Sequence, residues 1–131
     1  MLEEIAYETI RNFVFDNYPK IKVSPGECVY NFRCHLNAVH HAIRNGHHHV
    51  AMVIYISKNS NKPSIHFVNI NKEGKYTDNT VGEWSANFDY YLVSYIEKYR
   101  FFHIESEFTN YRKTLMKVPD PFIRFVANYS V

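Results

Sequence analysis

An almost continuously apolar segment, VAMVIYI at residues 50–56, restricts the fold of this chain more than any other feature of its sequence. Such a run is consistent with a central strand that is buried within a sheet. Residues 64–71 and 75–80 follow it and predict a hairpin around the turn at residues 72–74. The sequence therefore predicts a small antiparallel sheet at the centre of the fold.

The N-terminal residues 2–17 predict an amphipathic helix that closes over this core. Its apolar side chains share roughly one helical face, at Ile5, Ile10, Phe13 and Val14. Helix-breaking residues follow at Pro19 and at residues 24–26, where the sequence is SPG. The segment that leads from the helix to Cys28 is therefore expected to be a loop.

A second helix is predicted at residues 33–45, with Asn31 as its N-cap and Gly46 as its stop. Its apolar positions recur three and four residues apart, at Leu36, Val39 and Ile43. This spacing is typical of the buried face of a helix.

The C-terminal part of the sequence adds a further strand and a further helix. Residues 90–96 suit a strand, with a helix as the alternative. Residues 106–117 predict a helix that Pro119 and Pro121 end. Since no repeat, linker or low-complexity segment interrupts the sequence, residues 1–131 are expected to form a single α+β domain with helices packed on the sheet.

Charge and hydropathy argue against two classes of partner. Fifteen Lys and Arg balance 13 Asp and Glu, so the concentrated basic face of a nucleic-acid-binding protein is not expected. No apolar run approaches the ~18 residues that span a membrane, and the N-terminal sequence MLEE is unlike a signal peptide. The two cysteines, Cys28 and Cys34, form no disulfide framework, so a reducing cytoplasm is the expected location.

Three residues, in chain order, suggest a chemistry. Cys34 opens the second predicted helix, His66 lies in the first strand of the hairpin, and Asp78 lies in the second. In the first helical turn, the dipole and unpaired amides favour a thiolate and can stabilise an oxyanion. A thiol, a histidine and a carboxylate in these places are the parts of a cysteine nucleophile with an oriented base. Cys34, His66 and Asp78 are therefore the predicted catalytic residues.

The partner of His66 depends on the register of the hairpin. If residue 71 pairs with residue 75, Asp78 is a diagonal neighbour of His66 on the same face, and in a second register Asp78 faces His66 directly. A shift by one residue places Asn79 there instead, so Asp78 is preferred and Asn79 is the alternative. Because residue 78 is placed at a strand end, Asp78→Ala is expected to spare the fold, and Asn79→Ala to matter little.

The segments CHLNA at 34–38, HFVN at 66–69 and YTDNTVG at 76–82 resemble the papain-like and transglutaminase-like cysteine superfamily in its compact versions. The resemblance covers residues 28–96. It implies a papain-like core and cofactor-free acyl transfer or hydrolysis at an amide or thioester of a protein or peptide, as in peptidases, deamidases and transglutaminases. The small size and the Asn and Tyr content resemble those of phage or mobile-element products.

One position departs from the papain-type pattern. Papain-type enzymes carry a glutamine six residues before the nucleophile as an oxyanion donor, whereas this chain has Cys28, a poor donor. The oxyanion donors are therefore expected to be the amide of Cys34 and Asn31. Cys28 is the second choice of nucleophile, since CVYN at 28–31 echoes CHLN at 34–37.

The missing glutamine also supports an alternative function. The chain would then be a catalytically inactive papain-like fold that binds a protein, for instance a phage inhibitor of a host protein. Its contact surface would be the aromatic C-terminal half, which includes Phe101, Phe102, Phe108 and Tyr111.

A histidine-rich segment raises zinc binding as a third hypothesis, through His35, His40, His41, His47, His48 and His49. The spacing matches no known zinc finger, and only His41, seven residues after Cys34, shares the helical face of that cysteine. The histidines are therefore expected to be solvated side chains near a helix C-terminus, where they interact favourably with the dipole, and no metal is predicted.

Overall fold

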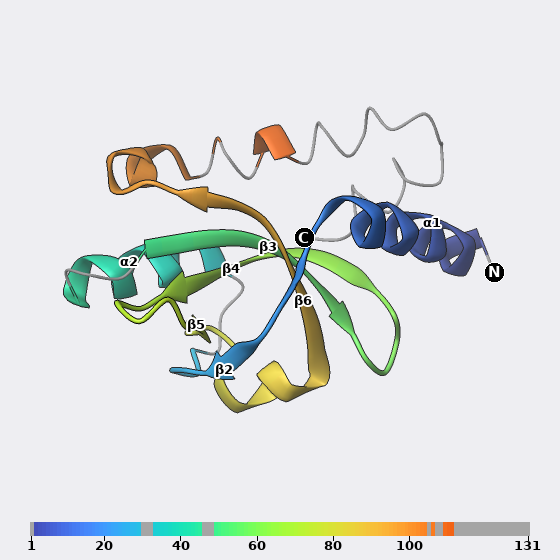
Figure 1. The fold of residues 1–131 in the computed structure, drawn as a ribbon, viewed down its shortest axis with the longest axis horizontal. Helices are drawn as coiled ribbons and strands as arrows, with labels where there is room; N and C mark the ends of the chain where they lie inside the picture. The colour runs from blue at the N-terminus through green and yellow to red at the C-terminus, as the bar shows by residue number, and fades with distance from the viewer. Residues whose placement is uncertain (1, 30–32, 46–48, 105, 107–108, 112–131) are drawn as a thin grey trace.

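The computed structural model of the chain describes residues 2–29, 33–45, 49–104, 106 and 109–111. It has a curled six-stranded sheet in the order β1-β6-β3-β4-β5-β2 (Figure 1). The strands are β1 Lys20–Ile21, β2 Val23–Pro25, β3 His49–Ser57, β4 Pro63–Ile70, β5 Tyr76–Asp78 and β6 Phe88–Ile96. The helices are α1 Leu2–Asn17 and α2 Cys34–Asn45, with the 3₁₀ helices η1 Gly82–Asn87 and η2 Lys98–His103.

Strand β3 is the central strand that the apolar segment predicted. It pairs antiparallel with β4 on one side and with β6 on the other. Val50, Met52 and Ile54 belong to the core cluster beneath the helices, and Ala51 and Val53 belong to a second cluster on the opposite face. Both faces of β3 are therefore buried, which explains why its sequence is apolar throughout rather than alternating.

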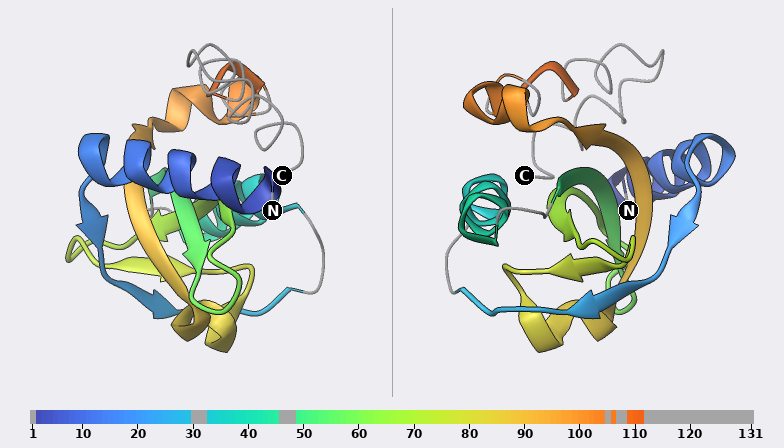
Figure 2. Two further views of the ribbon diagram at one scale, coloured as in Figure 1. Left: turned by 90° about the vertical axis from the view of Figure 1, so that its right-hand side faces the viewer. Right: turned by 60° about the vertical axis from the view of Figure 1, so that its left-hand side comes forward.

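Helices α1 and α2 lie toward opposite ends of the sheet and add side chains to one core cluster (Figures 1 and 2). The predicted helix at residues 2–17 is confirmed, and its Ile10 and Val14 are buried, but Ile5 is exposed. On the other side of the sheet a second cluster joins β3 and β4 to side chains of β1, β2 and β5. The curl of the sheet thus supplies the cover that a second layer of helices would otherwise provide.

The buried face of α2 differs from the predicted one. The buried side chains are Ala38, Val39 and Ala42, whereas Ile43 is 63% exposed. Two alanines one turn apart let α2 approach β4 closely, and the Asn69 side chain on β4 donates a hydrogen bond of 2.8 Å to the carbonyl of Ala38. Val39 is buried as predicted, but small residues make this contact, so the prediction was wrong for Ile43.

The segment expected to be a loop contains the short strands β1 and β2. Strand β2 pairs parallel with β5, so the sheet is mixed, although its other pairings are antiparallel. Pro25 is tolerated because β2 lies at the edge of the sheet. Strands of two and three residues are too short to give an alternating pattern, which is why the sequence did not reveal them.

Two predictions for the C-terminal part have different outcomes. Residues 90–96 lie in strand β6, so the strand is confirmed and the helix is excluded. Of the helix predicted at residues 106–117, residues 106 and 109–111 are helical, and the others lie outside the described residues, as do Pro119 and Pro121. Within the part of the chain that the structure describes, no helix has the length and apolar character needed to cross a bilayer.

Candidate active site

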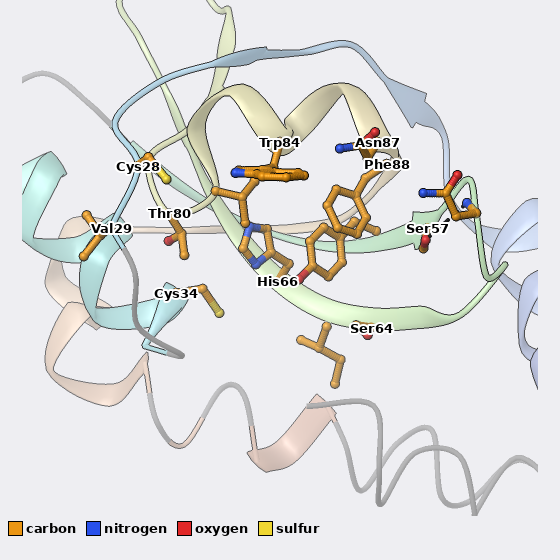
Figure 3. Close-up of a pocket in the computed structure, with 14 residues that line it drawn as sticks. Cys28, Val29, Cys34, Ser57, Ser64, His66, Thr80, Trp84, Asn87 and Phe88 are labelled. Carbon is orange, nitrogen blue, oxygen red and sulfur yellow. Dashed lines mark hydrogen bonds between the residues drawn. The ribbon is translucent and has the colours of Figure 1, made fainter.

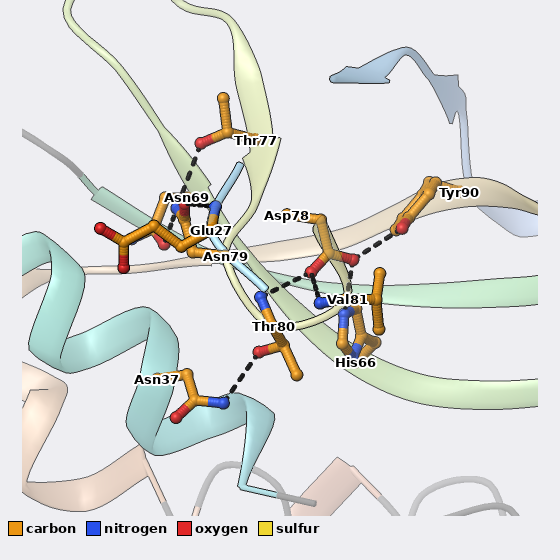
Figure 4. A network of polar contacts seen from close by, with 10 residues as sticks. All are labelled: Glu27, Asn37, His66, Asn69, Thr77, Asp78, Asn79, Thr80, Val81 and Tyr90. Carbon is orange, nitrogen blue, oxygen red and sulfur yellow. Dashed lines mark hydrogen bonds and ion pairs between the residues drawn. The ribbon is translucent and has the colours of Figure 1, made fainter. Parts of the chain in front are cut away.

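The hairpin register brings His66 and Asp78 together. Thr77 on β5 pairs with Asn69 on β4, which is the register in which residue 71 lies opposite residue 75. Asp78 is consequently the diagonal neighbour of His66, and His66 Nε2 lies 2.7 Å from Asp78 Oδ2 (Figure 4). The imidazole is 2% exposed and the carboxylate 0%. The predicted contact is confirmed, and it is fully buried.

Asp78 receives four hydrogen bonds. Besides the imidazole, Oδ2 accepts one from the Tyr90 hydroxyl at 2.6 Å, and Oδ1 accepts one each from the amides of Thr80 at 2.9 Å and Val81 at 3.0 Å. Burial by itself would raise the pKa of the Asp78 carboxyl, but the charge of His66 and these hydrogen bonds hold it below its ordinary value. Asp78 is therefore a carboxylate in which each oxygen accepts two hydrogen bonds.

This burial revises the expected effect of Asp78→Ala. Residue 78 is the last residue of its strand, yet the curl of the sheet encloses it completely. Its loss would leave His66, the Tyr90 hydroxyl and two amides without their acceptor. We therefore expect the variant to lose stability as well as activity.

Asn79 belongs to a separate network. Its side chain accepts a hydrogen bond from the amide of Glu27 at 3.0 Å and donates one to Asn69 Oδ1 at 2.9 Å (Figure 4). Asn69 in turn bonds to the carbonyl of Ala38 on α2. Asn79 thus connects β5 to β4 and to the segment before Cys28, so its replacement is expected to affect the fold and it is not a neutral control.

Cys34 lies at the start of α2, where His66 and His35 are the two side chains that lower the pKa of its thiol. Burial would raise the pKa of the thiol, but the hydrogen bonds from His35 and His66, together with their charges, lower it from 9.0 to about 6. Since Nε2 of His66 is taken by Asp78, Nδ1 is the nitrogen left to face the sulfur.

The charge of His66 is set by its two neighbours. Burial would lower the pKa of the imidazole, but the charge and hydrogen bond of Asp78, and those of Cys34, raise it from 6.5 to about 10. Both pKa shifts favour a thiolate beside an imidazolium. A thiolate beside an imidazolium is the reactive form of a cysteine nucleophile, because the imidazolium can donate a proton to a leaving group.

His35 is the site residue that the sequence reasoning missed, because it was considered only as a member of the histidine-rich segment. It follows Cys34 directly, and its ring lies 6.2 Å from that of Phe67 on β4. Its hydrogen bond lowers the pKa of Cys34. The adjacency of a histidine to a helix-starting cysteine was the available signal.

His35→Ala is therefore expected to raise the apparent pKa of the Cys34 thiol by about one unit, since a hydrogen bond to the thiolate is lost. The pH dependence of iodoacetamide labelling at Cys34 measures this value. His40→Ala is the matched control, because His40 is an exposed histidine on the same helix. An unchanged profile in His35→Ala would show that His35 does not act on the thiolate.

An aromatic stack fixes the plane of the imidazole. The rings of Tyr55 and His66 lie 4.2 Å apart at an angle of 3°, and Tyr55 stacks in turn on Phe88 at 4.2 Å and 19°. Tyr55 is on β3, in the cluster that contains Val53 and Tyr90. Alternation along β3 and β4 places Tyr55 and His66 on one face, but only the pairing of the two strands shows that their rings meet.

The sulfur and the imidazole open into a cleft of about 670 Å³. Figure 3 shows Cys34, His66, Trp84 and Phe88 around one space, with Ser64 toward its far end. A buried acid–base pair beside a solvent-accessible cleft is the arrangement that a substrate-modifying site requires.

Cys28 lines the same cleft but lacks the surroundings of Cys34. It is exposed and pairs through its backbone with Val81, and the described residues provide no histidine or carboxylate hydrogen bond to its thiol. Cys34 therefore stays the preferred nucleophile. Asn31, the predicted N-cap and oxyanion donor, lies outside the described residues, as do His47 and His48.

No metal cluster is found among the described residues, where His, Cys, Asp and Glu side chains form no group of three that could hold an ion. His41 and His49 belong to different elements, α2 and β3. The zinc hypothesis thus gains no support from the described part of the histidine-rich segment.

Comparisons of the chain with protein-family models, with curated proteins and with solved structures found no match.

Proposed function

We propose that this protein is a compact papain-like or transglutaminase-like enzyme that performs cysteine-dependent acyl transfer or hydrolysis at an amide or thioester. Cys34 is the nucleophile, His66 the general acid and base, and Asp78 the residue that orients His66. The observation that carries the proposal is the buried carboxylate–imidazole pair of 2.7 Å, whose imidazole lines the same cleft as a helix-starting thiol and lowers the pKa of that thiol.

The residues suffice for a two-step reaction. The Cys34 sulfur attacks the carbonyl carbon, a C–S bond forms, and the carbonyl oxygen takes the electron pair. When the intermediate collapses, the bond to the leaving nitrogen breaks and that nitrogen takes the proton from His66. Water or an amine then attacks the thioester, gives a proton to His66 and releases Cys34 as a thiolate.

Two features of the surrounding protein support this reaction cycle. Asp78 stays ionised because four donors hold it, so it stabilises the imidazolium without taking the proton. The N-terminus of α2 supplies positive potential for the oxyanion. No cofactor is needed, the substrate is a protein or peptide rather than nucleic acid or lipid, and a reducing cytoplasm would keep Cys34 usable.

A second candidate is a protein-binding module that retains this fold without catalysis, which the cysteine at position 28 favours. The aromatic contact surface first expected for it must be revised, because Phe101 and Tyr111 are buried in the core. Phe102 and Phe108 have side chains outside the described set. Biological activity that survives Cys34→Ala would support the binding module.

Trapping of an acyl-enzyme tests the proposed reaction. We expect thioester and activated-amide acyl donors to leave an acyl group on Cys34, detected by mass spectrometry after acid quenching. The adduct should be absent in Cys34→Ala and retained in Cys28→Ala, since Cys28 lacks a base. If a panel of donors labels neither cysteine, or labels Cys28 instead, the proposed mechanism is wrong.

A further inference from the structure

The cleft beside Cys34 is apolar for most of its length. Figure 3 shows Phe88 and Ser64 beyond His66 as seen from Cys34, and Tyr55, which stacks on Phe88, also lines the cleft. Its volume of about 670 Å³ lies within the range of sites that enclose a small ligand or part of a larger one. A substrate that presents its carbonyl to Cys34 must therefore place its adjacent groups along this aromatic wall.

The charge of the cleft restricts those groups. Among the described residues that line it, none is Asp, Glu, Lys or Arg, and the only ionised groups are Cys34 and His66 at the reacting end. A charged substrate side chain seated here would lose hydration without gaining an ionic partner, which is costly. The lining therefore selects against acidic and basic side chains next to the acyl carbon.

Trp84 indicates which neutral side chains fit. It lies on η1, lines the cleft and is 60% exposed, which is unusual for a large aromatic side chain. With Phe88 it presents apolar surface that a substrate would cover, and aromatic side chains gain from such stacking beyond the area they bury.

From these observations we infer that the cleft binds a neutral aromatic or branched aliphatic side chain of the acyl donor, against Trp84 and Phe88. The uncharged polar side chains of Asn87 and Ser64 line the same cleft and provide hydrogen-bonding groups for the amides that flank this side chain. The inference rests on the proposed function, because it identifies the acyl donor of the same site.

Trp84 is the only tryptophan of the chain, so its fluorescence reports binding without turnover. The experiment titrates the Cys34→Ala protein with N-acetyl amides of phenylalanine, leucine, glutamate and lysine, with excitation selective for tryptophan. We expect a saturable change with the phenylalanine and leucine amides, at affinities at least about tenfold above those of the charged amides. Equal affinities for the four amides, or no response to any of them, would overturn the inference.

Three further variants, made in the same Cys34→Ala protein, sharpen the test. Phe88→Leu keeps an apolar side chain in the core and should weaken binding of the phenylalanine amide about tenfold. Asn87→Asp adds a carboxylate to the cleft and should raise the affinity for the lysine amide. Phe15→Ala is the matched control, because Phe15 is an exposed aromatic residue on α1 outside the cleft lining. Unaltered binding in Phe88→Leu and Asn87→Asp would overturn the inference.

The outcomes separate this inference from the proposed function. Selective binding of the neutral amides without acylation of the wild-type protein would support the binding preference of the cleft and reject the enzyme. Acylation of Cys34 by charged and aromatic donors at equal rates would leave the enzyme standing and reject the inference.

Discussion

Replacing His66 with alanine is expected to lower the rate of Cys34 acylation about a thousandfold, within the range found when a general acid and base is lost. Two effects add. The thiolate loses the imidazolium that stabilises it, and the leaving group loses its proton donor. Stopped-flow or quenched-flow measurement of acyl-enzyme formation with an activated thioester checks the size of the effect.

His103→Ala is the control for this variant, because His103 is an exposed histidine of η2. Thermal melts of both variants establish that the comparison is between folded proteins. A His66→Ala protein that is folded and acylated at a rate near that of the wild type would remove His66 from the mechanism.

Asp78→Ala is expected to reduce the free energy of unfolding by about 3 kcal/mol or more, as is typical when one partner of a buried, hydrogen-bonded ion pair is removed. The carboxylate is 0% exposed and is the acceptor for His66, Tyr90 and two amides. Acyl transfer should also fall, since nothing then holds Nδ1 of His66 toward the sulfur. Urea denaturation and acylation rates measure the two effects.

Two other variants provide comparisons for the loss of stability in Asp78→Ala. Asp89→Ala removes a partly exposed carboxylate that lies 3.3 Å from Lys20, and an exposed pair of this kind is worth less than about 1 kcal/mol. Tyr90→Phe removes one of the four donors to Asp78 and should cost about 1 kcal/mol while leaving the contact with His66 in place. If Asp78→Ala lost no more stability than Asp89→Ala, the proposed contribution of the buried hydrogen bonds to Asp78 would be contradicted.

The pH dependence of the stability difference gives a further check on Asp78. Its folded pKa lies below the ordinary value of 3.8, so the stabilisation is fully present above that pH and is lost as the pH falls through the folded pKa. The difference in stability between wild type and Asp78→Ala should therefore shrink in acid. A difference that stays constant down to the acid transition would mean that the charge of Asp78 contributes nothing.

The sequence was sufficient to predict the contact of His66 with Asp78 and the place of Cys34, because each depends on local structure. A helix start fixes the place of Cys34, and hairpin alternation fixes His66 and Asp78 on one face. These are short-range consequences of the sequence, and the observed register is one of those in which Asp78 is the partner of His66.

The surroundings of Asp78 were not predictable in the same way. Tyr90 lies on β6, and β6 is separated from β5 in the sheet by β3 and β4. Its hydroxyl reaches Asp78 because the sheet curls, and neither the strand order nor the curl is encoded in a local pattern. The same reason explains why Asp78 was expected at an accessible strand end and was found fully buried.

The account is tested most directly by the pKa of the Cys34 thiol. In a Cys28→Ala variant Cys34 is the only cysteine, so the pH dependence of iodoacetamide labelling reports on Cys34 alone. We expect the Cys34 thiol to titrate with a midpoint near pH 6, and this midpoint should move toward the ordinary 9.0 when His66 is also replaced by alanine. A midpoint near 9.0 that is unchanged by the loss of His66 would contradict the assignment of Cys34 as an activated nucleophile.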